Sequence, residues 1–120
     1  MSRIMLAEDD HTMVTLLKTL LGMEGYQVVA LSVEDDDVFE SVRNDRPDVL
    51  LLDVHLPHIN GLEVLDQVRG DEETRDLKVV MTSGLNLELE CKNHGADDFL
   101  LKPYMPDDLL TILARNLNPS

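Results

Sequence analysis

Cysteine is nearly absent from this chain of 120 residues, which contains only Cys91. A single thiol excludes an intrachain disulfide and a zinc site built from several cysteines. Because disulfides are rare in reducing compartments, this cysteine usage favours a cytoplasmic setting. Long apolar runs are also missing. No stretch approaches the roughly 20 apolar residues of a membrane-spanning helix, and the first residues lack the apolar core of a secretory signal.

Basic residues are scarce as well. The chain has 10 Lys and Arg against 24 Asp and Glu, which gives a formal net charge of −14. Nucleic-acid binding depends on cationic side chains that neutralise phosphates, and anionic membrane surfaces repel an acidic protein. We therefore expect no direct binding to nucleic acid or membranes. An apolar fraction of 43% is ordinary for a globular protein, and the length predicts one domain over residues 1–120.

Five short apolar runs alternate with helical patterns along the chain. The runs cover residues 4–7, 27–31, 49–52, 79–81 and 99–101. Helical spacing of apolar residues predicts helices over about 13–21, 34–43, 61–68, 87–93 and from 106 onward. Strict alternation of strands and helices predicts an α/β fold with a parallel sheet covered on both faces. We expect the flavodoxin-like, doubly wound order 2-1-3-4-5 with five helices, in which strands 1 and 3 are neighbours.

Chemically active side chains follow four of these five apolar runs. In chain order the set is Glu8, Asp9, Asp53, Ser83 and Lys102. Taken singly, an acid or a hydroxyl at a strand end is usually a helix cap or a solvated loop residue. In an open parallel sheet, however, the carboxyl ends of the strands meet at one edge, and ligands bind there. Four such ends together favour a common site.

Three carboxylates at one place need a compensating cation. Two of them about 4 Å apart repel by roughly 4 kcal/mol at an effective dielectric constant near 20, and a third requires a cation or a raised pKa. Magnesium prefers oxygen ligands and completes its shell with water and phosphate. In such a site Asp53 would act as the nucleophile that forms an aspartyl phosphate. Lys102 would neutralise charge on the phosphoryl oxygens, and Ser83 would donate a hydrogen bond to one of them.

Five segments, in this order, resemble the receiver domain of bacterial two-component response regulators. They are LAEDD at 6–10, LLDVHLP at 51–57, NGL at 60–62, VMTSG at 80–84 and GADDFLLKP at 95–103. Each motif alone is weak, but together they cover essentially the whole chain. The resemblance implies that Asp53 accepts a phosphoryl group from a sensor histidine kinase or a phosphotransfer protein, with Mg²⁺ as cofactor. It also implies that the chain catalyses only its own phosphorylation and dephosphorylation.

The resemblance further implies the surroundings of Asp53. Asp9 is expected to bind the magnesium ion directly and Glu8 through water, while the backbone carbonyl of His55 is a third protein ligand. The side chains of His55 and Leu85 are expected to flank the phosphoryl group and tune its lifetime. The resemblance also implies structural roles for Pro57, Gly61 and Pro103. The peptide bond before Pro103 is expected to be cis.

Ser83 and Phe99 occupy the positions of the family's switch residues. By resemblance, Ser83 moves toward the phosphoryl group once Asp53 is modified, and Phe99 moves into the space that Ser83 leaves. This local change of charge shifts the equilibrium between two conformations of the domain. The face formed by the fourth helix, fifth strand and fifth helix then changes shape. A downstream protein, or a second copy of the chain in a phosphorylation-dependent homodimer, is expected to bind there.

Three features depart from the family pattern. Thr82 precedes Ser83, and because adjacent strand residues point to opposite faces, only one of them can serve as the switch; we favour Ser83. The interval from Ser83 to Lys102 is 19 residues, about one helical turn short for the family, and the loss should fall in the fourth helix. Met105 stands where a Ser, Thr or Asp cap normally precedes the last helix, which removes about 1 kcal/mol.

Two other functions stay open at this point. A receiver-like scaffold would bind partners without phosphorylation, although such a scaffold is expected to lose one of the acids or the lysine. A magnesium-dependent phosphohydrolase of the haloacid dehalogenase class would use the same nucleophile. That class carries a second acid two residues after the nucleophile, where this chain has His55, and 120 residues leave little room for a substrate-covering cap.

Overall fold

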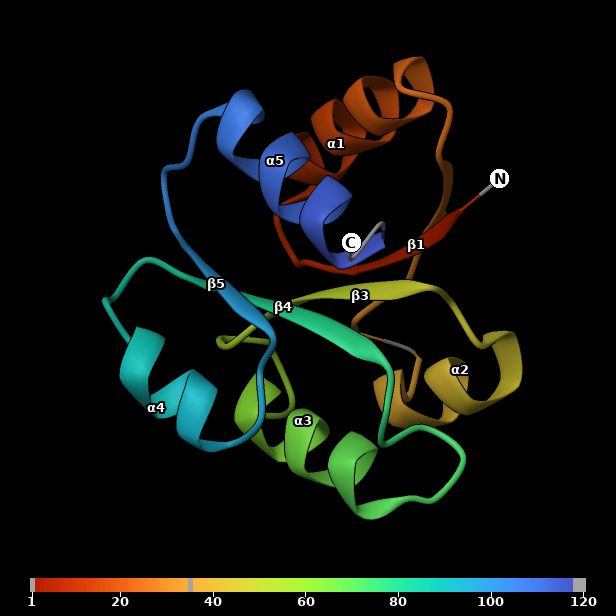
Figure 1. Ribbon diagram of the computed structural model, residues 1–120, viewed down its shortest axis with the longest axis vertical. Coiled ribbons are helices and arrows are strands. Elements are labelled where there is room, and N and C mark those ends of the chain that lie inside the picture. The colour runs from red at the N-terminus through yellow and green to blue at the C-terminus, as the bar shows by residue number, and fades with distance from the viewer. Residues whose placement is uncertain (1, 35, 118–120) are drawn as a thin grey trace.

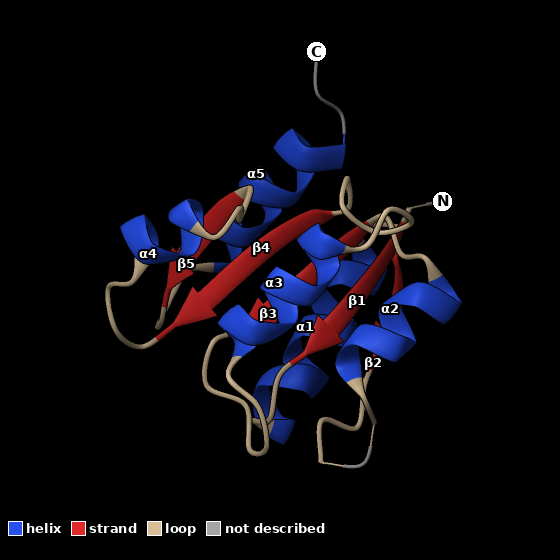
Figure 2. Ribbon diagram, turned by 90° about the horizontal axis from the view of Figure 1, so that it is seen from below, coloured by secondary structure: helices blue, strands red, loops and turns tan. Residues whose placement is uncertain are grey.

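Five parallel strands form one sheet in the order β2-β1-β3-β4-β5, which confirms the predicted flavodoxin-like topology. The computed structural model describes residues 2–34 and 36–117 (Figures 1 and 2). The strands are β1 (Arg3–Ala7), β2 (Gln27–Ala30), β3 (Val49–Asp53), β4 (Lys78–Ser83) and β5 (Asp98–Leu101). Because β3 lies at the centre of the sheet, its carboxyl end, with Asp53, lies between those of β1 and β4.

Helices cover both faces of this sheet (Figure 1). One layer contains α1 (His11–Met23) and α5 (Pro106–Leu117), and the other contains α2 (Val38–Asp45), α3 (Gly61–Gly70) and α4 (Glu88–Asn93). Strand β3 is buried throughout and contributes to both cores. Val49 and Leu51 pack toward α1 and α5, whereas Leu50 and Leu52 pack toward the other layer. This alternation explains why a central parallel strand reads as an unbroken apolar run.

Polar caps fix where three of the helices begin. The Asp10 carboxylate accepts the backbone N–H groups of Thr12 and Met13 at the start of α1. Asp37 caps α2, and Asn60 caps α3. The predicted start of the second helix near residue 34 is therefore wrong. The helix begins at Val38, because Asp37 has an extended backbone and its side chain accepts a hydrogen bond from the Glu40 N–H.

Helix α4 is the shortest helix in the described part of the chain. It has six residues, and Leu87 at the N-cap position has no side-chain oxygen that could accept a hydrogen bond from the N–H groups of the first turn. Its shortness agrees with the predicted loss of a turn between Ser83 and Lys102. No helix among the described residues has the length and apolar character needed to cross a membrane.

Candidate functional site

The acids predicted from the strand ends lie together at the carboxyl edge of the sheet. Ala7 pairs with Leu52 across β1 and β3, so the residues that follow them, Glu8 and Asp53, emerge side by side. Each of Glu8, Asp9 and Asp53 offers a carboxylate oxygen, and these three oxygens lie within 4.8 Å of one another. Glu8 and Asp53 are buried, at 7% and 5% exposure, whereas Asp9 faces solvent.

Backbone N–H groups orient the two buried carboxylates. The N–H of Asp10 donates to Glu8 Oε2 at 3.1 Å, and the N–H of His55 donates to Asp53 Oδ1 at 3.0 Å. In each case the donor lies two residues after the acid, in the turn that leaves the strand. These bonds leave Glu8 Oε1 and Asp53 Oδ2 directed at a common partner.

That common partner is Lys102, which follows β5. Its Nζ lies 2.6 Å from Glu8 Oε1 and 2.7 Å from Asp53 Oδ2. Burial acts to lower the pKa of Lys102, but the hydrogen bonds to Asp53 and Glu8 outweigh burial and raise it above its usual value. Burial also raises the pKa of Glu8, more than Lys102 lowers it. Burial and the negative charge of Glu8 raise the pKa of Tyr104 to about 12.

The donor set of the site fits a hard divalent cation. It consists of carboxylate oxygens, the ligands that magnesium prefers. Because Asp9 is exposed, an ion bound beside it would be accessible to water and to phosphate oxygens. Three carboxylates against one ammonium group leave an excess of negative charge even with Lys102 in place. A cation bound beside Asp9 would offset that excess.

Ser83 ends β4 at the same edge, but its hydroxyl is engaged elsewhere. Ser83 is completely buried. Its Oγ accepts the Leu85 N–H at 3.0 Å and lies 3.1 Å from His55 Nε2. The resemblance had assigned His55 a backbone role and a place beside the phosphoryl group. It did not predict a bond between the imidazole and Ser83, because no sequence pattern relates side chains at the ends of two different strands.

The remaining predicted residues frame the site. Gly61 begins α3 at a point where an ideal Cβ would lie only 2.3 Å from the Asp53 carbonyl oxygen, so only glycine fits without displacement. Pro57 is exposed in the loop between β3 and α3. Phe99, at 9% exposure, packs in the core cluster that contains Cys91 and Met81. The Lys102–Pro103 peptide bond is cis.

Comparison with known sequences identifies relatives over most of the chain. The family model of the response regulator receiver domain matches residues 4–114. Transcriptional regulatory protein CpxR of Klebsiella pneumoniae is 36% identical over 113 residues, which are 92% of this chain and 47% of that protein. Response regulator MprA of Mycobacterium tuberculosis is 33% identical over 109 residues, or 90% and 47%. The chain thus spans about half the length of these relatives.

Solved structures of receiver domains share the fold. The beryllofluoride-activated N-terminal receiver domain of Klebsiella pneumoniae RstA has a TM-score of 0.87 and 28% identity, covering 98% of this chain and 99% of that one. The receiver domain of the sensor histidine kinase PA1611 from Pseudomonas aeruginosa, with magnesium coordinated in its active site cleft, has a TM-score of 0.84 and 27% identity, covering 97% of both chains. The chain belongs to the family of response regulator receiver domains.

Proposed function

We propose that Asp53 is the phosphoacceptor of a two-component signalling pathway. An Asp53 carboxylate oxygen attacks the phosphorus of a phosphohistidine on a sensor histidine kinase or a phosphotransfer protein. The bond from phosphorus to the donor nitrogen breaks, and an acyl phosphate forms. The observation that carries this proposal is the orientation of Asp53. Its carboxylate is buried, with Oδ1 bonded to the His55 N–H and Oδ2 bonded to Lys102.

We infer that the cofactor is Mg²⁺. Asp9, Asp53 and the backbone carbonyl of His55 would bind the ion directly, and Glu8 would act through water. When bound, the ion neutralises charge on the phosphoryl oxygens. The clustered carboxylate oxygens support this assignment, as does the magnesium ion in the cleft of the PA1611 receiver domain.

Lys102 and Ser83 would then hold the transferred group. The ammonium group of Lys102 already contacts Asp53 Oδ2, so a short shift brings it to a phosphoryl oxygen and keeps the ion pair. Ser83 would turn its hydroxyl toward another phosphoryl oxygen, and Phe99 would follow into the space that Ser83 leaves. The complete set of acids and lysine does not favour a phosphorylation-independent scaffold.

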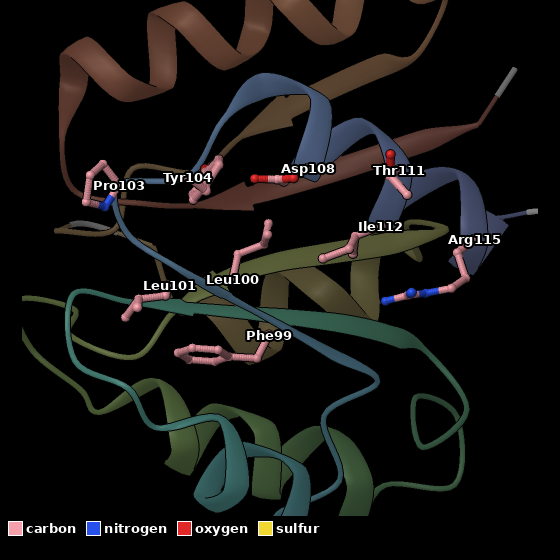
Figure 3. Close-up of a pocket in the computed structure, with 9 residues that line it drawn as sticks. All are labelled: Phe99, Leu100, Leu101, Pro103, Tyr104, Asp108, Thr111, Ile112 and Arg115. Carbon is pink, nitrogen blue, oxygen red and sulfur yellow. The ribbon is translucent and has the colours of Figure 1, made fainter.

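The proposed output surface is the α4-β5-α5 face. Between β5 and α5 lies a cavity of about 410 Å³, whose lining includes Phe99, Tyr104, Ile112 and Arg115 (Figure 3). Phe99 and Leu100 project from opposite sides of β5, Phe99 toward the α4 layer (Figure 3). A displacement of Phe99 would therefore reach both the cavity and α4. The partner would be a downstream protein or a second copy of the chain in a homodimer.

The proposed setting is the cytoplasm, where sensor kinases present their phosphorylated histidines and where a single free cysteine is unremarkable. The strongly acidic chain is not expected to bind nucleic acid itself. This expectation concerns the receiver domain alone, because the chain spans about half the length of CpxR and MprA.

The test is intact-mass measurement after incubation with acetyl phosphate and magnesium. We expect one phosphoryl adduct on the wild-type chain and on Asp107→Asn, a control that removes an exposed acid of α5. The adduct should be lost in Asp53→Asn and in the presence of a chelator. Adduct formation that survives in Asp53→Asn would contradict the proposal. So would the absence of both an adduct and binding of the phosphoryl mimic beryllofluoride.

A further inference from the structure

His55 connects the candidate nucleophile to the buried hydroxyl of Ser83. Its backbone N–H donates to Asp53 Oδ1 at 3.0 Å, and its imidazole Nε2 lies 3.1 Å from Ser83 Oγ. One residue of the β3-α3 loop therefore contacts the ends of two neighbouring strands. The loop itself is held in place, because His55 pairs with Asn60 in an antiparallel bridge and the Gly61 N–H donates to the Val54 carbonyl oxygen at 2.7 Å.

The hydroxyl of Ser83 has little freedom in this arrangement. A serine hydroxyl has one proton to donate and two lone pairs that accept. One lone pair accepts the Leu85 N–H at 3.0 Å, and the side chain is completely buried beneath the more exposed His55. Among the described residues, Leu85 and His55 are the two hydrogen-bond partners of Ser83 Oγ. If the hydroxyl donates its single O–H to the imidazole, it has none left to donate to another acceptor.

We propose that His55 is a positioning residue whose imidazole Nε2 accepts a hydrogen bond from the Ser83 hydroxyl and holds Ser83 in its resting orientation. Ser83 must exchange this bond for one to a phosphoryl oxygen when Asp53 is modified. This inference rests on the proposed function and specifies how the switch is held before phosphorylation. The effect of His55 is thus exerted through Ser83, not by direct contact with the phosphoryl group.

A double-mutant cycle on His55 and Ser83 tests this claim. The probe is beryllofluoride with magnesium, and its dissociation constant is measured by isothermal titration calorimetry. His55→Ala should bind the probe about 2- to 12-fold more tightly than wild type, the range that corresponds to the net free energy of one hydrogen bond. In the Ser83→Ala background the same change should alter the affinity by less than about 1.5-fold, because the coupled partner is gone.

Two further variants separate the hydrogen bond from other effects. His55→Gln places an amide near the position of Nε2 and should restore the affinity to within about 2-fold of wild type. His58→Ala removes another exposed histidine of the same loop, one with no bond to Ser83, and should leave the affinity unchanged. Urea unfolding of each variant shows whether the fold is retained.

A second readout needs no phosphoryl mimic. In the nitrogen-15 NMR spectrum of the resting domain, at a pH where the imidazole is neutral, His55 should carry its proton on Nδ1 and show an unprotonated, hydrogen-bonded Nε2. Ser83→Ala should shift the His55 Nε2 resonance and leave that of His58 in place.

Three results would overturn the proposal. One is an equal effect of His55→Ala in both backgrounds, which would mean that the imidazole acts directly on the bound group. Another is an unchanged or weakened affinity of His55→Ala. The third is a protonated Nε2, since the hydroxyl would then keep its own proton for the phosphate. If the wild-type chain binds no beryllofluoride and forms no adduct, the proposed function fails, but the nitrogen resonance still decides whether the His55–Ser83 bond exists.

Discussion

The carboxyl edge of the sheet and the neighbouring helix α4 are held by different kinds of interaction. At the edge, Lys102 Nζ lies within 2.7 Å of two buried carboxylates, and backbone N–H groups fix the other oxygens of both acids. Helix α4 has six residues and no side-chain cap, and its Leu89 is 76% exposed. The edge is thus fixed by short polar bonds, whereas α4 depends on the packing of a few side chains.

Exposed apolar side chains are also distributed unevenly between these two regions. The described residues include six large hydrophobic side chains that are exposed. Four of them lie between the end of β4 and the start of α5: Leu85, Leu89, Leu101 and Met105. A small movement at the edge would therefore reach apolar surface that a partner can bind, beside a short helix, α4, that has no side-chain cap. This contrast suits a fixed chemical site beside an adaptable output surface.

The largest expected effect comes from breaking the ion cluster of the edge. Lys102→Met should lower the free energy of unfolding at neutral pH by about 3 kcal/mol, because it leaves Glu8 and Asp53 buried without their cation. Lys92→Met, in α4, removes a surface pair with Glu88 at 3.4 Å and should change stability by less than about 0.5 kcal/mol. Urea unfolding compares the two.

The pH dependence of this loss has a definite sign. Burial already raises the pKa of Glu8, and Lys102 opposes that rise. A raised carboxyl pKa gives stability that is present at acid pH and is lost as the pH rises through the folded-state value. Without Lys102 the rise is larger, so the destabilisation of Lys102→Met should grow from about pH 4 to pH 7. A loss that is independent of pH, or equal to that of Lys92→Met, would contradict this account.

A smaller effect is expected from a methyl group at Gly61. In Gly61→Ala the new Cβ would meet the Asp53 carbonyl oxygen at 2.3 Å and Val54 Cα at 2.8 Å, both in the backbone. Relief of this overlap should cost about 1–3 kcal/mol of unfolding free energy. Because the displaced strand end carries Asp53, the rate of adduct formation should also fall.

Gly84, in the loop that leads toward α4, is the matched control. It has an ordinary backbone conformation and no atom within 4 Å of an ideal Cβ. Gly84→Ala should therefore be neutral or raise the unfolding free energy by up to about 1 kcal/mol, through the lower entropy of the unfolded chain. Similar losses of unfolding free energy in the two variants would mean that the backbone is packed no more closely around Gly61 than around Gly84.

The same contrast explains what the sequence could predict. Apolar periodicity was enough to locate the strands, because a central parallel strand is apolar on both faces, and their strict alternation with helices led to the expected flavodoxin-like order. The side chains that meet at the edge followed from their position directly after the strands. The start of α2 was missed, since four consecutive acids (34–37) compete to cap it and only the structure shows that Asp37 does so.

Side-chain bonds between segments far apart in the chain were not predictable from the sequence. The His55–Ser83 bond joins residues 28 positions apart. Arg69 on α3 donates to the carbonyl oxygens of Leu77 and Gly95 and to the Asp97 carboxylate, and so ties together the loops that precede β4 and β5. Arg69 stands on the helix as an ordinary charged residue, and no local pattern distinguishes it from a solvated one. Such contacts depend on side-chain direction in the folded chain.

The smallest expected effect is a gain of stability at the start of helix α5. Helix α5 begins at Pro106, and its preceding residue, Met105, is 67% exposed. Met105→Ser supplies an oxygen that accepts an N–H group of the first turn and should raise the unfolding free energy by about 1 kcal/mol. Met23→Ser, at the exposed end of α1, offers no such cap and should stay within about 0.5 kcal/mol of wild type.

The Met105→Ser variant also separates the two regions functionally. The edge keeps every bond described above, so the rate and metal dependence of adduct formation should match the wild type. Association of the beryllofluoride-treated chain should weaken, because one of the four exposed apolar side chains between the end of β4 and the start of α5 is gone. Sedimentation of the beryllofluoride-treated chain measures that binding. A changed phosphorylation rate with unchanged association would reverse the assignment of roles to edge and face.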